Sequence, residues 1–77
     1  MNLVLVEWAD AAFMQGWGSK EHAQHHRESN IASVGILVHE DCDRVTIVQS
    51  LSDRDDFGDG ITIPRVCIKR IRTLRVK

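Results

Sequence analysis

Two apolar runs joined by an acidic turn dominate the middle of the chain and constrain its fold most. The first run covers residues 31–40 and the second covers residues 44–51. Gly35 interrupts the first run, and a glycine inside a strand is typical of a bulge or a sharp bend. In the second run, Val45 and Ile47 alternate with other residues as they would in a strand with one buried face. We therefore predict a hairpin of two strands, the first of them strongly bent.

Shorter segments on either side predict three further strands. Residues 3–8 are apolar without clean alternation, so one face should meet the core and the other a helix or a second subunit. After a polar loop at 52–60, a strand should begin at Ile61 and end at Pro64, whose nitrogen cannot donate a ladder hydrogen bond. The last strand has an apolar spacing of three, which a one-residue bulge or a short helical turn would produce. Its residues expected to point inward are Ile68, Ile71 and Leu74.

The segment at residues 19–30 is polar on every side, with Ala23 as its only apolar residue. Ser19 is a suitable helix N-cap, and Glu21 would lie in the first turn, where the helix dipole favours a carboxylate. Burial cannot hold such a segment, so it should be a short exposed helix or a mobile insertion. The fold prediction is one all-β domain over residues 1–77, a small bent barrel of about five strands with this insertion.

Charge is distributed very unevenly along the chain. The net charge is −1, but residues 1–60 carry −7 while residues 61–77 contain no acid and carry +6. Such a division can create a cationic edge suited to an anionic partner. Alternatively, the last strand lies beside the acidic segments and the charges neutralise each other.

The cysteines and the N-terminal segment indicate a soluble cytoplasmic protein. Cys42 and Cys67 are too few for a disulfide framework, so we expect free thiols in a reducing cytosol. The apolar start is too short to span a membrane, and Glu7 follows it. A domain of this size buries only about 60% of its unfolded surface. We therefore expect a homo-oligomer, in which the first strand is an apolar edge that requires a partner.

Part of this pattern resembles the Sm-like proteins. Val34-Gly35-Ile36-Leu37, the acidic turn and Val45-Thr46-Ile47 are similar to their first motif, and Ile63-Pro64 followed by Ile68 and Ile71 is similar to the end of their second. The resemblance covers about 40 residues and implies an SH3-like or Sm-like small barrel. Arg44-Val45 stand where Sm-like proteins carry an Asn, and the Gly that shapes their RNA pocket is missing. We therefore rank nucleic-acid binding in the Sm manner below other functions.

The chain is also similar to small accessory proteins encoded by bacteriophages. The similar segments are Trp8-Ala9-Asp10-Ala11, Ser33-Val34-Gly35, Glu40-Asp41, Gln49-Ser50 and Ile63-Pro64. This resemblance implies a phage origin, a bacterial host cytosol and a short regulatory or counter-defence protein. It assigns no role to any particular residue.

Catalytic and metal-binding patterns are weak. His22, His25 and His26 would share one helix face, but they lie in the most polar segment and no Cys-x-x-Cys or His-Glu-x-x-His motif is present. The acidic loop that starts at Asp53 has Pro64 at its twelfth position, where an EF-hand requires Glu. We predict no enzymatic activity, no metal and no cofactor.

The basic C-terminal segment is the strongest functional signal, because arginine matches phosphate geometry. We predict a non-catalytic homo-oligomer that sequesters a nucleotide or cyclic-nucleotide defence signal. The predicted phosphate ligands are Arg65, Lys69, Arg70 and Arg72, and a base would stack on Trp8 or Trp17. One alternative is an inhibitor that binds a host defence enzyme through the acidic residues 1–60. Another is an Sm-like nucleic-acid-binding module.

Overall fold

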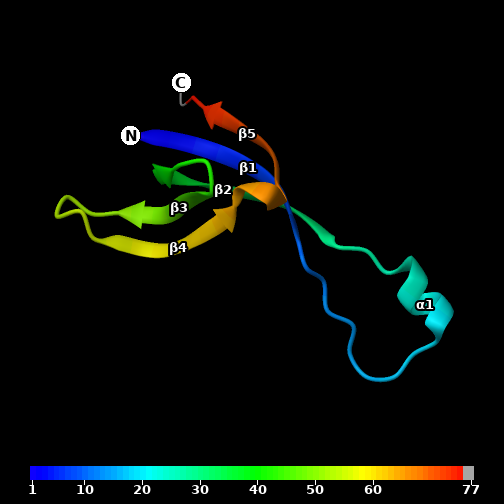
Figure 1. Ribbon diagram of the computed structural model, residues 1–77. Coiled ribbons are helices and arrows are strands. Elements are labelled where there is room, and N and C mark those ends of the chain that lie inside the picture. Colours follow the sequence, from blue (N-terminus) through cyan, green and yellow to red (C-terminus); the bar gives the residue numbers. More distant parts are fainter. Residues whose placement is uncertain (76–77) are drawn as a thin grey trace.

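The computed structural model describes residues 1–75, which form one five-stranded antiparallel sheet, one short helix and one 3-10 turn (Figure 1). The elements are β1 (Asn2–Asp10), α1 (Lys20–His25), β2 (Ser29–Glu40), β3 (Arg44–Leu51), β4 (Phe57–Pro64), η1 (Arg65–Cys67) and β5 (Ile68–Leu74). Their order in the sheet is β4-β3-β2-β1-β5. The predicted all-β class is confirmed, and the sheet curls like a small barrel without closing. Lys77 of the basic segment lies outside the described residues.

β1 is an interior strand, so the prediction of an apolar edge at this position is wrong. It pairs with β2 from Asn2↔Leu37 to Asp10↔Ser29, and with β5 on its other side. The burial of its side chains alternates along the strand: Val4, Val6 and Trp8 are buried, while Leu3 and Leu5 on the opposite face are half-buried. The strand edges that carry no pairing partner in this sheet belong to β4 and β5.

The core lies on the inner face of the curled sheet. It contains Val4, Val6, Trp8, Val45, Ile47 and Ile63. Ile63 of β4 belongs to the same cluster as the β1 residues although two strands separate β4 from β1. Only a strongly bent sheet brings those strands together, and burying each such side chain contributes about 1.5–3 kcal/mol.

The predicted bend occurs in β2. Residues 29–37 pair with β1 and residues 36–40 pair with β3, with a register shift between Leu37 and His39. Gly35 lies where the partner changes, and a Cβ atom there would come within 3.0 Å of the Val48 carbonyl oxygen. The absent side chain therefore permits the close approach of two strands at the bend.

A bulge in β5 explains its apolar spacing. Trp8 pairs with Ile68 and Glu7 pairs with Arg70, so Lys69 is the extra residue. The bulge keeps Ile68 and Ile71 on the core side, as predicted. Leu74, in contrast, pairs with Leu3 on the outer face, and the prediction that it points inward is wrong.

Residues 11–28 leave the sheet as an arm that contains α1 (Figure 1). Ser19 is its N-cap, as predicted, and its Oγ accepts a hydrogen bond from the His22 N–H at 3.0 Å. The helix buries no residue, which agrees with the predicted short exposed helix. The arm makes the molecule elongated, with extents of 51 × 27 × 22 Å.

The loop between β3 and β4 is shorter than the polar loop predicted at residues 52–60. Phe57 to Gly60 already belong to β4, in which Phe57 pairs with Leu51 and Gly60 pairs with Val48. This pairing across the hairpin overrides the turn-forming composition of the segment.

Candidate anion-binding site

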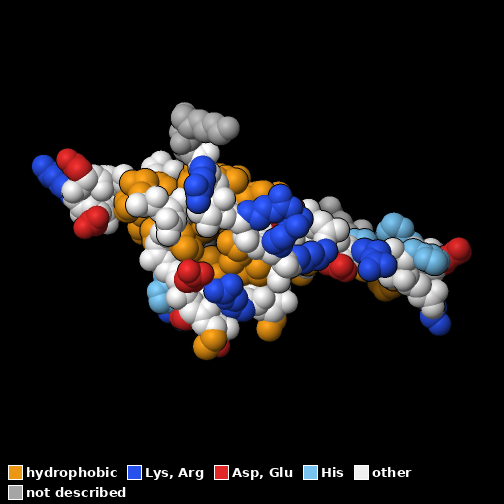
Figure 2. Space-filling model, turned by 90° about the horizontal axis from the view of Figure 1, so that it is seen from above, with side chains coloured by type: hydrophobic (Ala, Val, Ile, Leu, Met, Phe, Trp, Pro, Cys, Tyr) orange, Lys and Arg blue, Asp and Glu red, His pale blue; other side chains and the backbone are white. Residues whose placement is uncertain are grey.

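Three cationic side chains of β5 form an exposed group, here called the β5 cationic surface: Lys69, Arg70 and Arg72. Arg70 and Arg72 share the outer face of the sheet because they are two residues apart on one strand. Lys69 reaches solvent from the bulge. Figure 2 shows Lys and Arg side chains gathered where the arm leaves the sheet.

The three side chains differ in how far their charge is neutralised. Arg70 Nε donates to Glu7 Oε2 at 2.8 Å, and this hydrogen bond holds the pKa of Glu7 below its usual value. Lys69 Nζ donates to the neutral amide oxygen of Asn30, so its positive charge is not cancelled. Arg72 forms no ion pair with any residue in the described part of the chain. The surface therefore keeps a net positive charge.

An open hollow of about 510 Å³ lies beside this surface, between β5 and the start of β2. Its apolar wall contains Trp8, Ile31 and Ala32. Asn30, Glu7 and the two cations Lys69 and Arg70 form its polar rim. The hollow thus places positive charge next to apolar surface, a combination suited to a ligand with a charged and an apolar part.

Arg65 lies apart from the β5 cationic surface. Its Nε donates to the Asp41 carbonyl oxygen at 2.9 Å, and its Nη2 lies 3.2 Å from Glu40 Oε2. Its backbone N–H donates to the Asp43 carbonyl oxygen at 2.8 Å. These bonds fasten η1 to the turn between β2 and β3, so Arg65 has a structural role in this arrangement.

The same turn is organised by the Asp41 carboxylate. Oδ1 accepts hydrogen bonds from the backbone N–H groups of Asp43 and Arg44, and Oδ2 accepts one from His39 Nε2 at 2.7 Å. The bond from His39, followed by the two backbone bonds, holds the pKa of Asp41 far below its usual range. The Asp41 carboxylate therefore stabilises the turn by these hydrogen bonds.

The two tryptophans are not brought together. Trp8 is buried at 7% exposure and its Nε1 donates to Ser33 Oγ at 3.1 Å, so its ring faces are occupied by the core. Trp17 lies on the arm with its side chain fully exposed. The structure thus groups Lys69, Arg70 and Arg72 and places Arg65 and Trp17 elsewhere, with Trp8 contributing to the wall of the hollow.

Sequence reasoning missed Glu7 and Asn30 as members of the site. Glu7 is the only acid among residues 3–8, the predicted first strand, and that position was a signal that it faces solvent or a base. Asn30 reaches Lys69 only through the pairing of β1 with β2 and β5, which no local pattern reveals.

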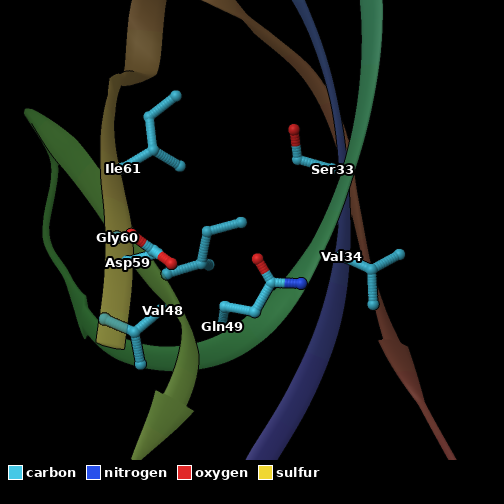
Figure 3. Close-up of a pocket in the computed structure, with 8 residues that line it drawn as sticks. Ser33, Val34, Val48, Gln49, Asp59, Gly60 and Ile61 are labelled. Carbon is cyan, nitrogen blue, oxygen red and sulfur yellow. The ribbon is translucent and has the colours of Figure 1, made fainter. Parts of the chain in front are cut away.

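A second hollow, of about 300 Å³, lies between β2 and the hairpin of β3 and β4 (Figure 3). Ser33 of β2 lies across it from Asp59 and Ile61 of β4, and the Val34 side chain points away from them. Asp59 is the charged residue in its lining, so this hollow is unsuited to an anion.

Residues 1–75 contain no group of three His, Cys, Asp or Glu side chains placed to hold a metal ion, and α1 ends at His25, before His26. In the same residues, no helix has the length and apolar character needed to cross a bilayer. Comparison with protein-family models, curated proteins and solved structures gave no match.

Proposed function

We propose that the protein is a non-catalytic binding module that holds an anionic ligand, such as a nucleotide phosphate, on the β5 cationic surface. The observation that carries the proposal is the positive charge of Arg72 and Lys69, which no carboxylate among residues 1–75 neutralises. Both cations are exposed and neither is paired with a carboxylate in the described part of the chain. Both lie on β5, and Lys69 also lines the open hollow together with Arg70.

The hollow supports a ligand of the nucleotide class. Ile31 and Ala32 offer an apolar wall against which a base or a sugar can pack, while the cations bind phosphate oxygens. Stacking on a tryptophan ring is not part of this proposal, because the ring faces of Trp8 are buried. Binding without turnover would lower the free concentration of the ligand, which suits the counter-defence role that the phage resemblance implies.

Calorimetric titration with a cyclic dinucleotide, a mononucleotide and inorganic phosphate tests the proposal. Loss of one charge-assisted hydrogen bond corresponds to about tenfold in affinity. We therefore expect Arg72→Gln and Lys69→Gln each to weaken nucleotide binding about tenfold. Arg54→Gln, which removes an exposed charge from the loop between β3 and β4, is the matched control and should leave the affinity unchanged.

Two outcomes would overturn the proposal. One is the absence of binding to all three probes at millimolar concentration. The other is equal affinity in the Arg72→Gln, Arg54→Gln and unmodified proteins. A single-stranded oligonucleotide serves as a fourth probe, and salt-dependent binding to it in preference to free nucleotides would favour the nucleic-acid alternative instead.

A further inference from the structure

The arm exposes large apolar side chains that the sheet of its own chain does not cover. Phe13 is 89% exposed, Met14 is 43% exposed and Trp17 is fully exposed. These three residues lie within five positions of one another in the chain, between β1 and α1. Large apolar side chains gathered in one exposed segment are typical of an interaction site.

A groove on the β3–β4 hairpin has the complementary character. Its volume is about 380 Å³, which is within the range of pockets that hold small organic groups. The apolar residues that line this β3–β4 groove are Val38, Val48, Leu51, Phe57 and Ile61. Phe57 is 67% exposed and Ile61 is 39% exposed, so the groove is open to an aromatic side chain.

Charge also matches between the arm and the groove. Residues 11–20 of the arm contain no acid, and Lys20 is their only charged residue. Asp55 lines the groove, and Asp53, Arg54 and Asp56 lie in the same loop between β3 and β4. The arm as a whole is net neutral, with Lys20 and Arg27 against Glu21 and Glu28, but the apolar residues 11–20 carry a single positive charge that favours association with this acidic loop.

The arm and the groove lie at opposite ends of one molecule (Figure 1). The molecule is 51 Å long, and the β1–β2 pairing fixes the base of the arm at Asp10 and Ser29, so the arm points away from the groove of its own chain (Figure 1). Two copies lying side by side in opposite directions place each arm against the groove of the other. Such an arrangement has two-fold symmetry, and it closes because both contacts are identical.

We propose that the arm docks into the β3–β4 groove of a second copy, with Trp17 as the inserted side chain, and that two copies form a reciprocal dimer. The contact buries Trp17 and Phe13 against Phe57 and Ile61. None of these contact residues belongs to the β5 cationic surface, so the dimer and anion binding can succeed or fail separately.

Sedimentation velocity of the full chain tests the dimer over a concentration series. The unmodified protein should sediment as two copies, and Trp17→Ala and Phe57→Ala should each weaken association at least tenfold. Val66→Ala truncates an equally exposed apolar side chain outside both surfaces and should leave association unchanged. Trp17 packs against no core residue, so the circular dichroism of its variant should match that of the unmodified protein.

A photo-cross-linking residue at position 17 tests the contact itself. In a mixture of isotopically light and heavy protein, cross-links should join position 17 of one copy to residues 48–61 of the other. A monomeric unmodified protein overturns the proposal and leaves the arm to a different partner. A dimer that is insensitive to Trp17→Ala, or cross-links confined to one copy, overturns it as well.

Discussion

A Cβ atom on Gly35 would lie 3.0 Å from the Cβ atom of Ile47, closer than side chains of neighbouring strands normally approach. Gly35→Ala should therefore force β2 and β3 apart at the bend and lower the free energy of unfolding by about 1–3 kcal/mol. Urea denaturation measures this change. At Gly18 the corresponding atom would lie 4.0 Å from the His22 ring, so Gly18→Ala is the control and should be neutral within about 0.5 kcal/mol. Equal stability of the two variants would contradict the role assigned to Gly35.

Trp8 is fixed in the core by its hydrogen bond to Ser33. Ser33→Ala should cost about 1 kcal/mol, since it leaves the part-buried indole N–H without this acceptor. Trp8→Phe removes the same bond from the other side, so the double variant should cost less than the two single variants added together. Denaturation followed by circular dichroism measures all three. Ser50→Ala, at an exposed position of β3, is the control, and strict additivity would show that the bond contributes nothing.

Acid should destabilise the protein in part through Asp41. The pKa of this carboxyl is lower in the folded chain than its ordinary value of 3.8, so near that pH the unfolded chain binds more protons. The stabilisation is therefore complete above pH 3.8 and is lost as the pH falls below it. Asp41→Asn should lower the thermal midpoint at pH 7 and reduce its further fall at low pH. Identical pH profiles of the variant and the unmodified protein would show that the turn does not depend on the ionised carboxylate.

Removing the carboxylate that neutralises Arg70 should strengthen anion binding. Glu7 lies 2.8 Å from Arg70 Nε, so Glu7→Gln should tighten nucleotide binding about fivefold by releasing one positive charge. Calorimetric titration at low salt measures the change, and added salt should diminish it. Glu28→Gln alters the net charge equally but lies on the arm, so it should have a smaller effect. Unchanged or weaker binding by Glu7→Gln would place the ligand away from Arg70.

The parts of the fold that follow local rules could be predicted from the sequence. The bounds of β3 match the alternating run at 44–51, the cap of α1 follows from Ser19, and the bend in β2 follows from Gly35. The start of β4 could not be predicted. Phe57 to Gly60 have the composition of a turn, and only pairing with β3 makes them a strand.

The candidate site was predictable as a group of bases but not in its final membership. Lys69, Arg70 and Arg72 remain together because they follow one another on a single strand. Arg65 lies only four residues before Lys69, yet the 3-10 turn directs its side chain toward the Asp41 turn. The positions of the Arg65 and Trp8 side chains depend on contacts between segments that are distant in the sequence. The phage origin, the cytoplasmic location and the counter-defence role remain predictions.

The residues of the sheet stabilise the fold, whereas the residues of the arm contribute little to its stability. β1 and β2 stay hydrogen-bonded as far as Asp10 and Ser29, so residues 11–28 start from a fixed position but add nothing buried from α1 to the core. Substitutions in that segment should therefore leave the stability of the sheet unchanged. If the proposed docking holds, the arm can change its affinity for a partner while the sheet stays the same.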